Sequence, residues 1–288
     1  MTDTNIDYIL EPAVYLTATF IMFVIGKYVY QLFHPKIDVK SELVIKDNFA
    51  FAIAHTGYFV GLLIAIGSAI VGPSHGLIID IIDIAVYGSL AIILLNISTI
   101  INDKFVLNKF DVRKEIIEDQ NEGTGAIEAA SAIGSGLIIY GSVTGETDFL
   151  LFGILTSVVF WAIGQVIMVI TSKVYNLITS YDIHEHIEKD NVAVGLGFAG
   201  AIIAISNLIR FSLMGSFVSW DVSLIKVGEY VLIGYVFLFV TRFIADKILL
   251  PGQKLTDELI NQEKPNIGAG LIEAFAYIGG SVLITWSL

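Results

Sequence analysis

The chain of 288 residues is 55% hydrophobic and only 15% charged, which argues against an ordinary soluble globular protein. Its mean hydropathy of +0.78 indicates that most of the chain lies in lipid. The absence of cysteine excludes disulfides, thiolate metal ligands and a cysteine nucleophile. The net charge of −12, from 16 Lys and Arg against 28 Asp and Glu, excludes a soluble nucleic-acid-binding protein.

Apolar runs long enough to cross a membrane recur along the chain. A helix needs about 20 residues to span a hydrocarbon core of roughly 30 Å. The sequence therefore predicts an all-α membrane protein with eight transmembrane helices. The residues before the first run are acidic, so we expect a mature helix there and not a cleaved signal peptide. In chain order, the predicted spans are residues 13–33, 49–71, 78–101, 126–143, 149–171, 192–211, 222–244 and 267–286.

The basic residues indicate how these spans are oriented. Lys and Arg near the ends of spans are retained on the cytoplasmic side. They gather in the connections after the first, third, fifth and seventh predicted spans, and only Arg210 and Lys226 lie elsewhere. This pattern predicts a multi-pass protein with both termini outside the cytoplasm.

The sequence repeats itself at an offset of 143 residues. Residues 46–50, Lys-Asp-Asn-Phe-Ala, match residues 189–193, Lys-Asp-Asn-Val-Ala; after a two-residue insertion, residues 121–129 match residues 266–274. The repeat predicts two four-helix membrane units, residues 1–145 and 146–288. Because four is even, both units enter from the same side, and we expect parallel halves with equivalent residues around a shared central interface.

These motifs resemble the YjfL-like bacterial inner-membrane proteins, a domain of unknown function (DUF350) often found as two tandem copies. The resemblance covers nearly the whole chain. It rests on Asp-Asn-x-Ala at the start of the second span of each copy, and on Asn-x-Gly-x-Gly-x-x-Glu-Ala at the start of the fourth. It implies a polytopic protein of the bacterial inner (plasma) membrane with no assigned activity. It also implies relatives encoded near phage-shock-type envelope-stress proteins and ATP-grasp ligases, and it supplies no catalytic residues.

The matched glutamates Glu128 and Glu273 are the first candidates for a function. Each lies about one turn into an apolar helix, after a Gly-x-Gly. An ionised carboxylate in hydrocarbon is costly unless it is paired, hydrated or protonated, so it marks a candidate ion or substrate path. The structural alternative is that each glutamate interacts with the positive end of its helix dipole.

Asp47 and Asn48, with Asp190 and Asn191, precede two other apolar helices. Asp and Asn are good N-caps, and we expect capping to be their main role. The functional alternative is an acidic ring, formed with the glutamates, that gathers cations. His55 could titrate near neutral pH, but the second copy has Phe198 in its place.

Charged residues also gather at the opposite ends of the spans, where ion pairing or snorkelling is expected. This outer charged cluster comprises Asp80, Asp83, Arg210, Asp221, Lys226 and Glu229. A weaker pattern, His184-x-His186, offers two ligands for a divalent metal between the copies, but spacing fixes no third ligand.

No nucleotide-binding, metalloprotease or nucleophile-elbow motif is present, so we expect no enzyme and no cofactor. The first functional hypothesis is a channel or transporter for a small cation, namely a metal ion, proton or polyamine, along the interface between the repeats. The alternative is a membrane scaffold that docks a cytoplasmic envelope-stress partner. The expected partners are the lipid bilayer and a second copy of the chain, with no nucleic acid.

Overall fold

The computed structural model describes residues 4–71, 74–144, 149–215, 217–250 and 252–288, without the side chains of residues 4–9. Eight helices in these ranges are long and apolar enough to cross a membrane, and the same ranges contain no strand. The predicted all-α fold is confirmed. The predicted boundary between residues 145 and 146 lies outside the described residues. The eight helices are α1 (Thr4–Phe33), α2 (Phe49–Gly67), α3 (Leu77–Ile101), α5 (Glu122–Val143), α6 (Leu150–Ile178), α8 (Val192–Leu213), α9 (Trp220–Ile244) and α11 (Ile267–Ser287).

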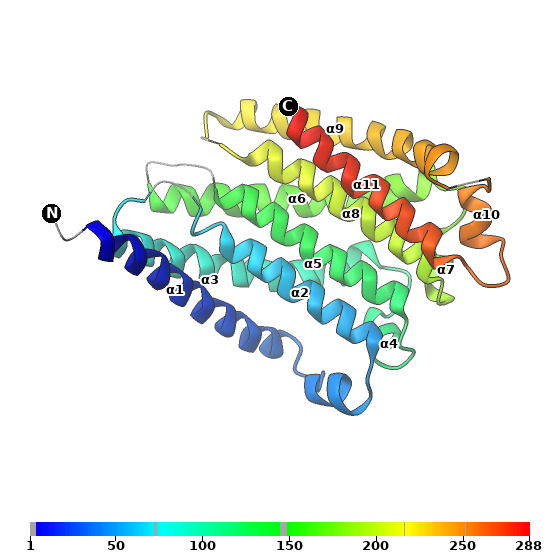
Figure 1. The fold of residues 1–288 in the computed structure, drawn as a ribbon, viewed down its shortest axis with the longest axis horizontal. Coiled ribbons are helices and arrows are strands. Elements are labelled where there is room, and N and C mark those ends of the chain that lie inside the picture. The colour runs from blue at the N-terminus through cyan, green and yellow to red at the C-terminus, as the bar shows by residue number, and fades with distance from the viewer. Residues whose placement is uncertain (1–3, 72–73, 145–148, 216, 251) are drawn as a thin grey trace.

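Short helical elements gather at one end of the bundle, and both termini lie at the other (Figure 1). We call these the loop end and the terminal end. The loop end carries the one- to two-turn helices α4 (Val112–Ile117), α7 (Ile183–Glu188) and α10 (Leu255–Ile260), and the π-helical turns η1 (Ser41–Ile45), η2 (Asn102–Val106) and η3 (Ala245–Leu249).

Four asparagines start the helices α2, α5, α8 and α11 at the loop end. The side-chain oxygen of each accepts the N–H of the residue three positions on, at 2.9–3.2 Å. The amide nitrogens of Asn48, Asn121 and Asn191 donate to carbonyls of α4, α7 and α10, respectively. The predicted capping by Asn48 and Asn191 is therefore confirmed, and each cap also fastens a short helix to its long one.

The helices α2, α5, α8 and α11 lie side by side in one row, and α1, α3, α6 and α9 pack against it (Figure 1). Small residues bring the backbones of the row together. A Cβ atom added at Gly57 would lie 2.2 Å from the Cα of Ala129, and one added at Gly200 would lie 2.4 Å from the Cα of Ala274. These two contacts are equivalent in the repeat, so the α2–α5 and α8–α11 pairs pack in the same way.

The two halves are parallel, but they do not share a central interface of equivalent residues. The main contact between them joins α5 of the first repeat to α8 of the second, with a smaller contact of α6 on α3 and α5, and α8 is the counterpart of α2. The prediction that equivalent residues of the two repeats surround a common centre is therefore wrong. The halves follow one another along the row, so each repeat surrounds its own glutamate.

We expect Gly57→Val to destabilise the protein by about 1–3 kcal/mol or more, because the added carbons overlap the backbone of α5. Unfolding of the purified protein in detergent, followed by circular dichroism, measures this loss. Gly228→Val on α9 is the control, since a Cβ there has no atom within 4 Å. Equal effects of the two substitutions would contradict the close packing of α2 on α5.

Candidate functional site

In the second repeat, Glu273 is fully buried and paired with a cation. Its Oε1 atom accepts hydrogen bonds from the guanidinium of Arg242 on α9, from the Tyr175 hydroxyl at 3.1 Å and from the Tyr277 hydroxyl at 2.8 Å. The Arg242 side chain is only 12% exposed, and its guanidinium lies 5.8 Å from the centre of the Tyr181 ring. Glu273 is thus neutralised within its own repeat.

In the first repeat, Glu128 has no such cation. Asp103 in η2 lines the same cavity, and the two carboxyl groups are close enough to influence one another electrostatically. The buried oxygens Glu128 Oε1 and Asp103 Oδ1 receive no hydrogen bond within the described chain. Two neighbouring ionised carboxylates repel one another, so a proton or another cation is needed between them.

Both carboxyl groups line a cavity of about 300 Å³ that lies within the first repeat. Its walls come from α1, α2, α3, η2, α4, α5 and the connection after α1, and its apolar side includes Tyr30, Phe51 and Tyr58. The size is at the lower end of the range for small-ligand pockets. The cavity is placed towards the loop end, where α4 closes one side.

Two substitutions between the repeats explain why this space is open. At the repeat position of Arg242 the first copy has Thr99, and at that of Tyr277 it has Ala132; both residues line the cavity. The side chains that cover Glu273 are therefore missing around Glu128.

The basic side chains near the cavity do not neutralise the carboxyl pair. Lys36 and Arg113 line the cavity but are exposed, and neither forms a salt bridge with Glu128 or Asp103 in the described part of the chain. Burial lowers the pKa of His34, so its ring is neutral at pH 7 and adds no charge.

The other residues predicted for the path do not join the two glutamates. Asp47 and Asp190 are exposed, and each adopts a positive φ, of 52° and 59°, just before the capping asparagine. The expected acidic ring is therefore absent among the described side chains. His55 is 5% exposed, packs on Tyr30 at 4.7 Å and has a buried Nδ1 atom without a hydrogen-bond partner.

Of the two alternatives expected for the outer charged cluster, ion pairing or snorkelling, no ion pair is found among the described residues. Arg210 donates to the side-chain oxygen of Asn207 at 3.1 Å and packs over the Tyr140 ring. Lys226 donates to the carbonyl of Met214, whereas Asp221 and Glu229 are exposed.

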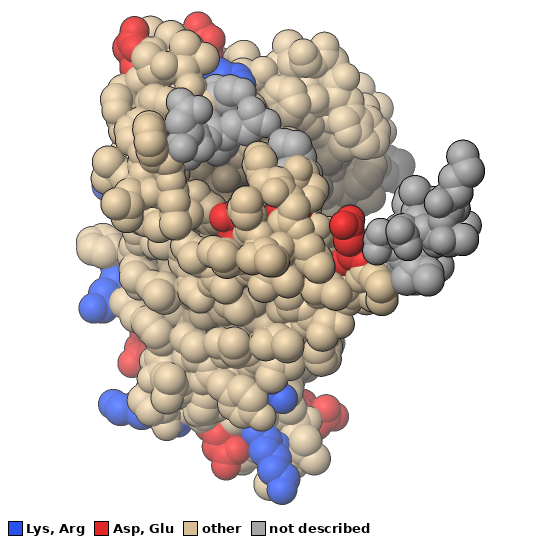
Figure 2. Space-filling view, turned by 90° about the vertical axis from the view of Figure 1, so that its left-hand side faces the viewer, with Lys and Arg blue, Asp and Glu red and all other residues tan. Residues whose placement is uncertain are grey.

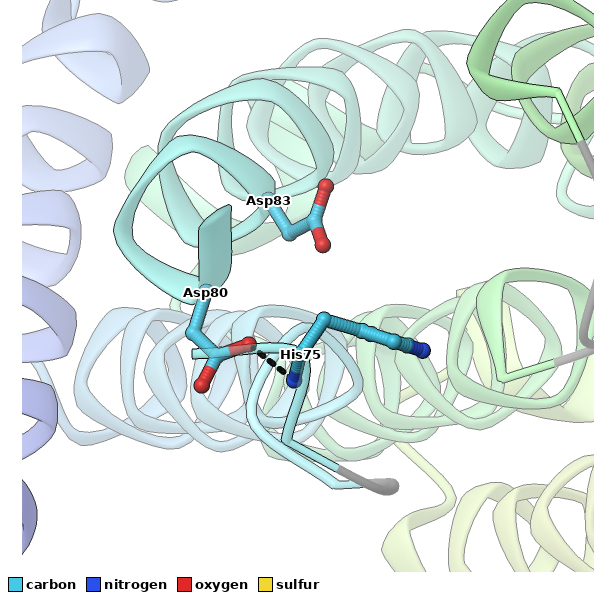
Figure 3. Close-up of side chains that lie close together, drawn as sticks. All are labelled: His75, Asp80 and Asp83. Atoms are coloured by element: carbon cyan, nitrogen blue, oxygen red, sulfur yellow. Dashed lines mark hydrogen bonds between the residues drawn. The ribbon is translucent and has the colours of Figure 1, made fainter. Parts of the chain in front are cut away.

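His75, Asp80 and Asp83 are the only described group of three side chains that could hold a metal, with ligand atoms within 4.8 Å of one another (Figure 3). Asp80 already accepts hydrogen bonds from the hydroxyls of Tyr15 and Ser74, both at 2.6 Å, and from the backbone N–H of His75. These bonds hold the loop before α3 against α1, so they give Asp80 a structural role.

His184 and His186 are not brought together with a third metal ligand in the ranges that the structure describes. The Nε2 atom of His184 lies 2.9 Å from the carbonyl oxygen of Val106, and His186 packs edge-on against Tyr181. Both rings therefore have packing roles, contrary to the metal hypothesis.

Sequence reasoning missed Asp103, Thr99 and Arg242 as site residues. Asp103 matches Asp246 in the repeat, and this match was the available signal. Asp246, however, accepts the Leu255 N–H at 2.6 Å and pairs with Lys247, so the two aspartates have different roles.

We expect Arg242→Met to destabilise the protein by about 3–5 kcal/mol, because it leaves a buried carboxylate without its partner. The double variant Arg242→Met, Glu273→Gln should recover much of that loss. Thermal unfolding of both variants in detergent measures the difference. If the double variant is as unstable as the single one, the Arg242–Glu273 pair is not the cause.

Comparison with known proteins agrees with the duplicated fold. A family model described as Domain of Unknown Function (DUF350) matches residues 4–143 and again residues 149–288. The chain is 26% identical to a UPF0719 transmembrane protein of Aquifex aeolicus (strain VF5) over 211 residues, 72% of this chain and 76% of that protein. It is 27% identical to the UPF0719 transmembrane protein YshE of Bacillus subtilis (strain 168) over 125 residues, 43% of this chain and 87% of that protein. No solved structure matches. The chain therefore belongs to the DUF350 family of transmembrane proteins, with two tandem copies of the family domain.

Proposed function

We propose that this protein is a transporter or channel for a small cation, and that Glu128 and Asp103 form its binding site. The observation that carries this proposal is a pair of buried carboxyl groups that line one cavity of about 300 Å³ and have no salt-bridge partner among the described residues. Such a pair attracts positive charge strongly in a medium of low dielectric constant. The function is non-enzymatic in this proposal.

The site belongs to the first repeat, and this changes the pathway expected from the sequence. The contact between the repeats is filled by backbone: a Cβ added at Gly141 on α5 would lie 2.6 Å from the carbonyl oxygen of Arg210 on α8. A cation path along that interface would have to part these helices. We therefore place the path between α1, α2, α3 and α5, where the cavity is.

The proposed orientation places the cavity near the cytoplasmic side of the membrane, so in this proposal the cation binds from the cytoplasm. The loop end carries most of the Lys and Arg residues, and such residues are retained on the cytoplasmic side. Figure 2 looks onto the terminal end, which is mostly uncharged with scattered acidic side chains, while the visible basic ones lie mainly at the margins. In this proposal the protein lies in the bacterial inner membrane with both termini outside.

A single cysteine at either end tests this orientation, because the natural chain has none. Val218→Cys at the terminal end should react with a membrane-impermeant maleimide added to intact cells. Gln253→Cys at the loop end should react only after the cells are lysed. Both side chains are exposed, so the labelling reports sidedness and not burial. The opposite pattern would reverse the proposed orientation.

Glu128→Gln tests transport. Proteoliposomes with the natural chain should pass at least one of protons, K⁺, Mg²⁺ or spermidine, and Glu128→Gln should reduce that flux by about tenfold or more, since it removes the buried charge. Glu229→Gln is the control, because Glu229 is exposed at the terminal end. Flux that is absent for all four cations, or unchanged in Glu128→Gln, contradicts the proposal. In either case the scaffold hypothesis becomes the better one.

A further inference from the structure

We propose that the first-repeat cavity binds an organic cation with a guanidinium head group, and that Arg242 is a covalently attached counterpart of this ligand in the second repeat. The inference rests on the proposed function for its cation class and adds the chemistry of the head group. It follows from comparing how the two copies treat the same buried carboxylate.

The second repeat shows how this fold neutralises its glutamate. Glu273 accepts a hydrogen bond from the guanidinium of Arg242, which also lies over the Tyr181 ring. Glu128 is the repeat counterpart of Glu273, but Thr99 is the counterpart of Arg242. The first copy therefore has the acceptor, Glu128, but no arginine that donates to it. The space that such an arginine side chain would occupy is part of the cavity that Thr99 lines.

Neither carboxyl group of the first copy has a salt-bridge partner among the described residues, whereas Glu273 has one. Glu128 Oε1 and Asp103 Oδ1 are both buried and receive no hydrogen bond within the described residues. A guanidinium offers several N–H donors in one plane and can satisfy two carboxylates at once. A proton between the two groups would satisfy only one such bond.

The remaining walls suit a planar, weakly hydrated cation better than a metal ion. The aromatic residues Tyr30, Phe51 and Tyr58 line the cavity, and guanidinium groups stack on aromatic faces. Ca²⁺ and Mg²⁺ require about six or more oxygen ligands. Beyond the two carboxyl groups, the described lining is largely aliphatic and aromatic and offers few further oxygen ligands.

The direct test is binding of n-propylguanidinium, which reproduces the arginine side chain beyond its Cα atom. Isothermal titration calorimetry on the full chain in detergent should detect one site, and n-propylurea, a neutral analogue of similar shape, should not bind. Equal binding of both compounds, or no binding of n-propylguanidinium, overturns the inference.

The variant Thr99→Arg tests whether the guanidinium of an arginine side chain can occupy the cavity in place of the ligand. The new side chain starts at the repeat position of Arg242, so it should fill the cavity, lower the affinity for n-propylguanidinium by about tenfold or more and raise the unfolding temperature. Gln253→Arg, which adds a guanidinium at an exposed position outside the cavity lining, is the control and should retain the affinity within about twofold. Retained affinity in Thr99→Arg contradicts the proposal.

Arg242→Thr is the reciprocal change and should open a second site beside Glu273. It is expected to raise the stoichiometry from one to two, and n-propylguanidinium should restore part of the thermal stability lost with the arginine. If Arg242→Thr does not fold, Thr99→Arg still decides the question. A folded Arg242→Thr protein with no added site and no restored stability counts against the equivalence of the two copies.

These measurements distinguish a failure of the guanidinium assignment from a failure of the proposed transport function. Binding that is sensitive to Thr99→Arg, without flux of any cation in proteoliposomes, contradicts transport alone. Flux of K⁺ or Mg²⁺ that requires Glu128, without binding of n-propylguanidinium, contradicts the head-group assignment alone.

Discussion

Backbone contact between neighbouring helices of the α2, α5, α8, α11 row is the constraint on which the rest of the structure depends. At Gly57 and Gly200 there is no room even for a Cβ atom. Helices this close admit a long polar side chain only where the facing residue is small, as at Gly197 of α8, where an added Cβ would lie 2.4 Å from the Oε2 atom of Glu273. Most partners of the two glutamates therefore come from the second row and its adjoining turns. Glu273 is bound by residues of α6 and α9 as well as by Tyr277 of its own helix, and Glu128 shares its cavity with Asp103 of η2.

The same constraint explains where the row ends. Between α5 and α8 the contacts use small groups, such as Gly134 against Ser206. The repeat counterpart of Ser206 on α2 is Leu63, and that of Gly141 on α11 is Trp286; these side chains are 52% and 80% exposed. Large apolar groups on the outer faces of α2 and α11 suit contact with lipid chains and prevent the close approach found inside the row.

The sequence predicted most of the fold because the determining signals are local. Apolar length defines the eight spans, and an asparagine before an apolar run defines a helix start. The partners of the glutamates were not predictable in this way, because they depend on contacts between distant helices. Arg242 had been assigned to the cytoplasmic basic residues at a span end, and only its contact with Glu273, 31 positions further along the chain, identifies it as a buried partner.

The two copies differ in how they balance one buried carboxylate, and the difference has an energetic consequence. In the second copy, removing either partner leaves a buried charge, so Arg242 and Glu273 stabilise the fold only together. In the first copy, Glu128 and Asp103 have no salt-bridge partner among the described residues, so their burial lowers the stability of the fold relative to neutral residues of the same shape. A natural chain retains such a local cost mainly at functional sites. Under the proposed function, binding of a cation recovers that free energy, and the first repeat is then the half of the molecule that responds to a ligand.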